Sequence, residues 1–176
     1  MQIDDFHLRS CKLDDARAYS RFMQSNAERF RSMMPEFDLA EWTEAYWVKN
    51  IENWIELEEA PTQKKFLIVG PDHTIIGDIT YSNIVMGPLR ACYLGYKLDG
   101  AYEGRGIMSR ALDLANTYMF TEIGLNRIMA NYRPENVKSA ALLKRLGFRI
   151  EGYAKNYLRL DGDWRDHVLT AKTSVV

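Results

Sequence analysis

Residues 96–109, Tyr96-Lys97-Leu98-Asp99-Gly100-Ala101-Tyr102-Glu103-Gly104-Arg105-Gly106-Ile107-Met108-Ser109, join an apolar strand to a helix through a loop with three glycines. A helix start leaves backbone N–H groups free and carries a partial positive charge. Glycines let a ligand approach that backbone closely. The segment therefore favours an anion cradle suited to a phosphate or diphosphate, to which Arg105 can add a charge-assisted contact. A glycine loop that only turns a corner is the alternative.

Helices and strands alternate through the rest of the chain. Apolar runs predict strands near 7–9, 65–69, 74–81, 91–98, 127–132, 152–160 and 164–171. Apolar residues spaced by three and four predict helices near 14–23, 39–58, 107–119 and 136–146. Asp161-Gly162 predicts a hairpin between the last two strands. Since no linker or repeat interrupts this order, we expect one α/β domain over residues 1–176, with a mixed sheet flanked by helices.

The composition excludes several classes of protein. Of 176 residues, 47% are apolar and 27% charged, which is typical of a globular domain. A net charge of −1 gives no general affinity for DNA or an anionic membrane. Cys11 and Cys92 are too few for a disulfide framework, and three scattered histidines do not predict a metal site. Residues 1–5 show no leader pattern and no run is long enough to span a membrane, so we expect a cytoplasmic protein.

Charge is distributed unevenly along the chain. Residues 36–59 hold eight acidic residues against Lys49 alone, whereas residues 97–176 hold thirteen basic and nine acidic residues. One interpretation is a solvated acidic helix face. The sharper one is that the C-terminal half binds an anion and the acidic stretch faces a cationic partner.

A second polar motif follows the strand expected at 127–132. Pro134 turns the chain, and a helix begins near Asn136. Asn136 and Ser139 are three residues apart, so both can face one side of the first turn, although either could be only a helix cap. The dinucleotide fingerprint would need glycine at Ser109, and no P-loop string is present, so neither of those cradles applies.

Together these motifs resemble the GNAT N-acetyltransferase superfamily. The resemblance rests on the loop at 103–109, the Asn-x-x-Ser motif about 30 residues later and the following Leu146-Gly147-Phe148. The segments 91–96, 127–132, 151–155 and 161–167 are similar to its ribosomal-protein N-terminal acetyltransferases, in particular the RimJ branch that acts on the N-terminal alanine of small-subunit ribosomal protein S5. The resemblance is close over about 90–172 and loose before that.

The resemblance implies a splayed central sheet and acetyl-CoA as cosubstrate. It implies that the cofactor is bound by Tyr96, Lys97, Leu98, Gly104, Arg105, Gly106, Ile107, Met108, Ser109, Asn136 and Ser139. Ser139 would also assist the departing thiolate, and Glu151 is a candidate base. The implied partner is the basic N-terminal segment of a ribosomal protein, which the acidic stretch 36–59 would attract.

Four positions depart from the family pattern. The loop has Glu103 at its start, and Met108 at its end could narrow the cradle. Tyr93 replaces a Glu that many relatives carry, and Leu143 replaces a Tyr that serves others as general acid. The usual base and acid therefore cannot be carried over.

Direct transfer to an N-terminal amine tolerates that loss. At pH 7.5 about a third of α-amines are neutral, but only about one in a thousand lysine ε-amines. We therefore expect transfer to a protein N-terminus without a dedicated base. Two alternatives stay open: acetylation of a small amine, such as a polyamine, amino acid or aminoglycoside, and a non-catalytic acyl-CoA-binding or ribosome-associated module.

Overall fold

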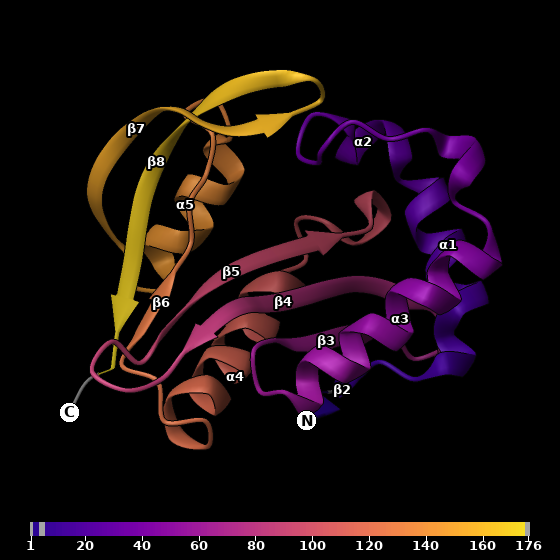
Figure 1. Ribbon diagram of the computed structural model, residues 1–176, viewed down its shortest axis with the longest axis horizontal. Helices are drawn as coiled ribbons and strands as arrows, with labels where there is room; N and C mark the ends of the chain where they lie inside the picture. The colour runs from indigo at the N-terminus through magenta and orange to yellow at the C-terminus, as the bar shows by residue number, and fades with distance from the viewer. Residues whose placement is uncertain (1, 4–5, 175–176) are drawn as a thin grey trace.

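The computed structural model describes residues 2–3 and 6–174 as one sheet with helices on both faces (Figure 1). Met1, Asp4 and Asp5, which belong to the segment considered for a leader, lie outside the described residues. In chain order the elements are β1 (Gln2–Ile3), β2 (Phe6–Ser10), η1 (Leu13–Asp15), α1 (Ala16–Ser25), α2 (Ala27–Arg31), η2 (Leu39–Glu41), α3 (Glu44–Glu59), β3 (Lys64–Val69), β4 (Ile75–Val85), β5 (Ala91–Leu98), η3 (Gly100–Tyr102), α4 (Ile107–Thr121), β6 (Arg127–Met129), α5 (Val137–Arg145), β7 (Arg149–Leu160) and β8 (Asp163–Thr173).

The sheet is splayed at its only parallel pair. Its order is β1-β2-β3-β4-β5-β6-β8-β7, and among the described strands only β5 and β6 run parallel. These two pair over Ala91–Tyr93 alone. After β6 ends, the chain keeps its bonds only to β8, which β6 already pairs with on its other side: the Tyr132 amide donates to the Val168 carbonyl at 3.2 Å. The expected mixed α/β fold with a splayed sheet is confirmed.

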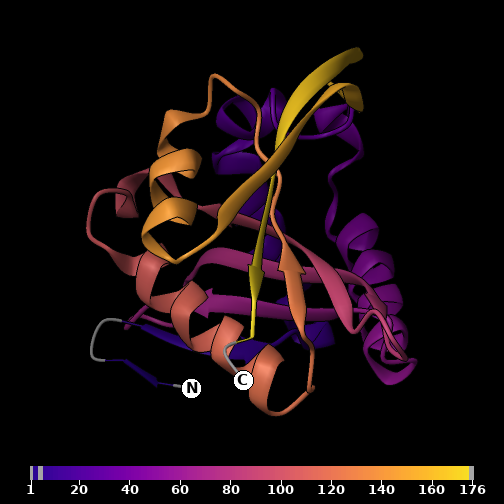
Figure 2. The ribbon, with the colours of Figure 1, turned by 90° about the vertical axis from the view of Figure 1, so that its left-hand side faces the viewer.

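Two apolar cores lie on opposite faces of the sheet. One joins α4 and α5 to β2–β6, with Ile128 and Leu112 fully buried. The other packs α1 and α3 on β3 and β4 through Tyr19, Trp47 and Leu67. Figure 2 shows the helices of the two cores on either side of the sheet. On the second face helices cover β3 and β4, whereas Tyr93 on β5 remains 37% exposed.

Several predicted elements have different bounds in the structure: β4 and β7 are longer than expected, and β1 and α2 were not predicted. The helix expected over 39–58 is broken, because Thr43 caps a new helix by accepting a hydrogen bond from the Tyr46 amide at 3.2 Å, and η2 precedes it. The strand expected over 127–132 ends at Met129, because the following amides bond only to β8. Asp161 and Gly162 adopt φ of 48° and 80°, so the predicted hairpin turn is confirmed.

The hairpin of β7 and β8 reaches across to the N-terminal helices. The Asp161 amide at its tip donates to the Met34 carbonyl at 2.9 Å. Arg133, in the loop between β6 and α5, makes a second contact to this region: its Nη1 donates to the Ser32 carbonyl at 2.6 Å. The tip therefore meets the segment that follows α2, as Figure 1 shows. No helix within the described residues has the length and apolar character needed to cross a membrane.

Candidate active site

The loop before α4 has the form of an anion cradle. Gly104 and Gly106 have φ of 75° and 73°, and a Cβ placed on either would meet no atom within 4 Å. Gly106 is the N-cap of α4 and has no side chain with which to cap the free amides of the first turn. The loop thus combines free N–H donors, the positive end of a helix dipole and open space.

The side chains of the cradle point elsewhere. Ile107 and Met108 are buried in the α4–α5 core, so only their main-chain groups can reach a ligand, and the Met108 side chain packs in the core. Arg105 lies with its guanidinium carbon 5.4 Å from the centre of the Tyr102 ring. The guanidinium therefore lies beside the loop, where it can add charge.

The second half of β5 offers an open edge. Residues 94–98 pair with β4 on one side, while β6 has already ended on the other. Leu98 packs against the α4–α5 core. Lys97 points to the other face of the sheet, where its Nζ lies 3.4 Å from Asp78. Lys97 and Leu98 thus contribute main-chain groups to this edge. An extended amide-bearing chain could pair with it as another strand would.

Ser139 and Tyr96 meet beside this open edge. Their hydroxyl oxygens lie 2.7 Å apart. Burial raises the pKa of Tyr96, and the hydrogen bond to Ser139 partly offsets that rise. Asn136 caps α5, since its Oδ1 accepts from the Ser139 amide at 3.1 Å. The cap fixes the first turn of α5 and with it the position of Ser139.

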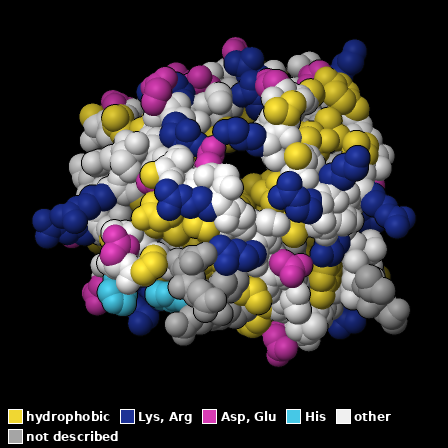
Figure 3. Space-filling view, turned by 180° about the vertical axis from the view of Figure 1, so that it is seen from behind, with side chains coloured by type: hydrophobic (Ala, Val, Ile, Leu, Met, Phe, Trp, Pro, Cys, Tyr) yellow, Lys and Arg dark blue, Asp and Glu magenta, His cyan; other side chains and the backbone are white. Residues whose placement is uncertain are grey.

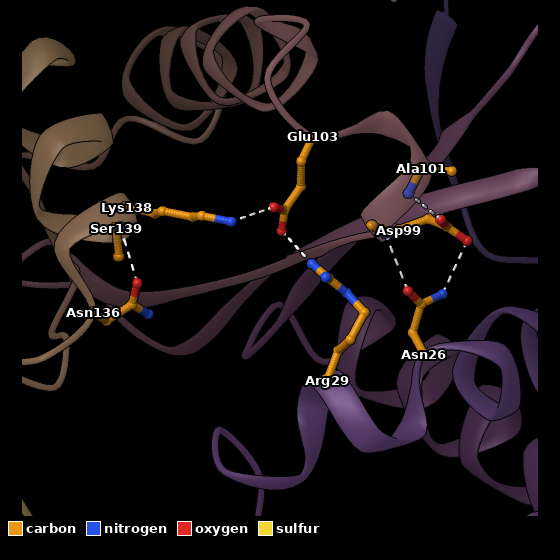
Figure 4. Close-up of polar contacts among 9 residues, drawn as sticks. Asn26, Arg29, Asp99, Ala101, Glu103, Asn136, Lys138 and Ser139 are labelled. Atoms are coloured by element: carbon orange, nitrogen blue, oxygen red, sulfur yellow. Dashed lines mark hydrogen bonds and ion pairs between the residues drawn. The ribbon is translucent and has the colours of Figure 1, made fainter.

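Glu103 ties the cradle to two other elements (Figure 4). Its carboxylate accepts a hydrogen bond from Lys138 Nζ at 2.6 Å, and it is also paired with Arg29 of α2. The bond from Lys138 lowers the pKa of Glu103. Since Lys138 is the neighbour of Ser139, this acidic side chain connects the loop, α2 and α5 at one point.

A second contact fixes the same loop to α2. Asn26 Nδ2 donates to Asp99 Oδ2 at 2.9 Å, and Asn26 Oδ1 accepts from the Gly100 amide at 3.2 Å (Figure 4). Arg29 lies so close to Gly100 that a Cβ there would be 2.8 Å from its guanidinium carbon. Seen from behind, the surface is hollowed, and Lys and Arg side chains surround the hollow (Figure 3). This charge suits an anionic ligand.

Glu151 does not join this group. Its carboxylate accepts two hydrogen bonds from Arg127 Nη1, at 2.7 and 2.8 Å. Arg127 pairs in register with Ala91, five residues before Tyr96 on β5, or about 16 Å away along a strand. The structure therefore places Glu151 at the far end of the sheet from Ser139.

Sequence reasoning named Tyr96 for cofactor binding and Glu103 as a departure in the loop, but it missed the contacts that these side chains make, and it missed Arg29. The hydroxyl of Tyr96 acts on Ser139 from another element, and Glu103 and Arg29 link the loop to α2. No spacing rule joins residues that far apart in sequence. Among the described residues, no group of His, Cys, Asp and Glu is arranged to hold a metal ion.

Comparison with known proteins adds a family to this geometry. The family model described as an acetyltransferase (GNAT) domain matches residues 5–149. The chain is 52% identical over 110 residues to the ribosomal protein uS5-alanine N-acetyltransferase of Escherichia coli K12. That match covers 62% of this chain but only 57% of the length of the Escherichia coli protein.

Two solved structures share the whole architecture. The ribosomal-protein-S5-alanine acetyltransferase of Vibrio fischeri superposes with a TM-score of 0.94 and 37% identity, over 98% of this chain and 95% of that one. RimJ of Mycobacterium smegmatis, solved with CoA-disulfide, superposes with a TM-score of 0.91 and 33% identity, over 95% of this chain and 81% of that one.

Proposed function

Because the chain belongs to the GNAT acetyltransferase family, we propose that it transfers the acetyl group of acetyl-CoA to the N-terminal α-amine of a protein, the N-terminal alanine of ribosomal protein S5 above all. The resemblance to ribosomal-protein N-acetyltransferases of the RimJ branch seen in the sequence is confirmed by these relatives. The observation that carries the proposal is the hydrogen-bonded Ser139–Tyr96 pair, which lies beside an open strand edge that leads to a cradle of free amides.

The site fits a coenzyme A thioester in three respects. Free amides over Arg105–Ser109 suit a diphosphate, and open space lies above Gly104 and Gly106. The unpaired edge at 94–98 suits the amide-bearing arm of the coenzyme. The Arg105 guanidinium beside the loop suits its phosphates. Bound acetyl-CoA would supply an activated acetyl group, and the protein would supply orientation, charge and protons.

The residues divide the reaction between them. A main-chain N–H of the open β5 edge stabilises the negative charge that develops on the carbonyl oxygen as the amine attacks. Ser139 donates its proton to the sulfur as the carbon–sulfur bond breaks, and Tyr96 returns a proton to Ser139 through their hydrogen bond. The proton lost from the amine passes to water, and water returns a proton to Tyr96, so the site ends in its starting protonation state. Ser139, reprotonated by Tyr96, thus takes the place of the general acid that is absent at Leu143.

The acidic stretch supports a basic acceptor. The stretch 36–59 begins just after Met34, which the tip of the β7–β8 hairpin contacts, and Glu36 lies beside Gly162 of that tip. Four of its acidic residues are exposed: Glu36, Asp38, Glu41 and Glu44. A basic N-terminal segment would be drawn to that entrance. A polyamine would be drawn there too, so acetylation of a small amine is the second candidate function.

A direct assay separates these functions. The protein is incubated with acetyl-CoA and either a basic peptide that begins with alanine or spermidine, and thiol release and the acetylated product are measured. We expect kcat/KM to be higher for the peptide, with the acetyl group on its α-amine. Faster reaction with spermidine would favour the small-amine function. Absence of amine-dependent thiol release with either acceptor would leave only the non-catalytic module.

A further inference from the structure

A β-bulge interrupts the pairing of β7 with β8 close to the open face of the sheet. Ala154 pairs with His167 and Leu158 pairs with Arg165, so residues 155–157 of β7 lie opposite Asp166 alone. Such bulges re-aim a side chain while the strands stay paired on either side.

Asp166 stabilises this bulge. It accepts hydrogen bonds from the Asn156 amide at 2.8 Å and from the Tyr153 hydroxyl at 2.6 Å. Asn156 adopts φ of 49°, a left-handed conformation that asparagine tolerates better than most residues. The irregular segment is therefore held in one conformation, and Tyr157 is held with it.

The bulge directs Tyr157 onto His167. Their ring centres lie 5.4 Å apart at 53°. His167 is only 4% exposed, and its Nδ1 lies 3.1 Å from the Arg165 carbonyl, to which it must donate because a carbonyl only accepts. His167 is thus a fixed support for the Tyr157 ring.

The hydroxyl of Tyr157 joins two other polar groups. It accepts a hydrogen bond from Asn131 Nδ2 at 3.1 Å. Burial, together with a hydrogen bond to the Tyr93 side chain, raises the pKa of Tyr157. The hydroxyls of Tyr157 and Tyr93 therefore lie next to each other. Of their four lone pairs, Asn131 uses one and the bond between the two phenols uses another, so two lone pairs and one O–H remain for a ligand, whichever phenol is the donor.

Tyr93 lies at the vertex of the splay. It is the last β5 residue paired with β6, and its neighbours Cys92 and Leu94 pack in the α4–α5 core, so Tyr93 faces the other side of the sheet. Gly95, on the same side two residues on, has open space where a Cβ would stand. The two phenols therefore border a free volume on the helix-free part of this face.

We propose that the hydroxyls of Tyr93 and Tyr157 bind the primary amine of the acceptor. The inference rests on the proposed function. Acetyl-CoA with its diphosphate at Gly106 and its amide-bearing arm along the strand edge from 98 to 94 would carry its acetyl group towards Tyr93. An amine nitrogen brings N–H donors, and the phenol oxygens still have lone pairs to accept them. Held in this way, the amine presents its own lone pair to the carbonyl carbon, and the bulge gives the acceptor site its shape.

Tyr93→Phe and Tyr157→Phe test this role, since both keep the ring that packs. Calorimetry measures how the protein with bound coenzyme A takes up an alanine-initiated basic peptide, with its α-amine free or acetylated. We expect the wild type to prefer the free amine. Each variant should lose about tenfold in affinity for the free-amine peptide and in kcat/KM. Binding of the acetylated peptide and of coenzyme A should not change.

Tyr153→Phe is the matched control, because it removes a phenol from the same bulge on the other face of β7, and Asn156 still bonds to Asp166. It should bind the free amine as the wild type does. Equal wild-type affinity for the two peptides, wild-type affinity in both site variants, or an equal loss in the control would overturn the inference. A wild type that discriminates the peptides but transfers no acetyl group would instead refute the proposed function alone.

Discussion

The hydroxyl oxygens of Tyr96 and Ser139 lie 2.7 Å apart, although Tyr96 is on β5 and Ser139 is on the first turn of α5. The splay between β5 and β6 leaves the edge beside Tyr96 free of a neighbouring strand. The structure thus combines a paired proton donor with an open main-chain edge, and both features are needed for the chemistry proposed.

Ser139→Ala should lower kcat by about a hundredfold, since a positioned general acid contributes on that order or more. The dissociation constant of acetyl-CoA should change little, because in the proposed site main-chain groups would make most of the contacts to the cofactor. Stopped-flow thiol release and calorimetric titration measure the two quantities. Tyr96→Phe should have a smaller effect alone and almost none when added to Ser139→Ala. A wild-type kcat in Ser139→Ala would show that Ser139 is not the proton donor.

Gly106→Ala should weaken coenzyme A binding by about tenfold or more, because its Cβ would occupy the open space of the cradle. Gly87→Ala is a matched control: Gly87 also has φ of 73° and no atom within 4 Å of a Cβ, but it lies in the turn between β4 and β5. Both substitutions should cost about 1 kcal/mol of stability through the left-handed backbone. Equal coenzyme A affinity in the two variants would rule out the cradle at Gly106.

Neutralising the acids beside the hairpin tip should raise KM for a basic peptide. The variant combines three substitutions before α3: Glu36→Gln, Asp38→Asn and Glu41→Gln. Its control combines three substitutions on α3 itself: Glu52→Gln, Glu56→Gln and Glu59→Gln. Exposed charges are screened over about 8 Å at physiological salt, so the wild-type KM should rise with salt and the first variant should lose most of that dependence. The same loss in the control would argue for a diffuse field rather than an entrance.

Asp78 should make the free energy of unfolding decrease at acidic pH. Burial alone would raise its pKa, but Lys65 and Lys97 outweigh that effect and lower it to about 2. Its folded pKa is below the ordinary 3.8, so its contribution is complete above about pH 4 and is lost as the pH falls towards 2. Urea unfolding across that range should show a loss of about 2 kcal/mol from this group.

Asp78→Ala is the matching variant at neutral pH. It should cost about 3–5 kcal/mol, because Lys65, whose side chain is 5% exposed, would be buried without its partner. Asp113→Ala, on the exposed face of α4, should change stability little. Similar unfolding free energies for the two variants would contradict this account of the buried pair.

The sequence by itself determined most of the elements and their order, although not β1, α2 or the short 3-10 turns. Apolar spacing located the strands and helices, because side-chain periodicity is a local property that burial enforces. Glycines at 104 and 106 indicated a cradle, and Asn136 indicated a cap, because left-handed backbone and free helix ends demand particular residue types. The bounds that differed, at 39–58 and 127–132, depended on which partner each amide bonds to.

Only the tertiary structure decided which side chains act together. The pairing of Tyr96 with Ser139, the link from Glu103 to α2 and α5, and the contact of the tilted Tyr157 and His167 rings each join distant segments. It also separated Glu151 from Ser139 by most of the length of a strand. These outcomes follow from the register of β5 and β6 and from the β7 bulge, and register is set by packing across the whole sheet, which no local stretch of sequence encodes.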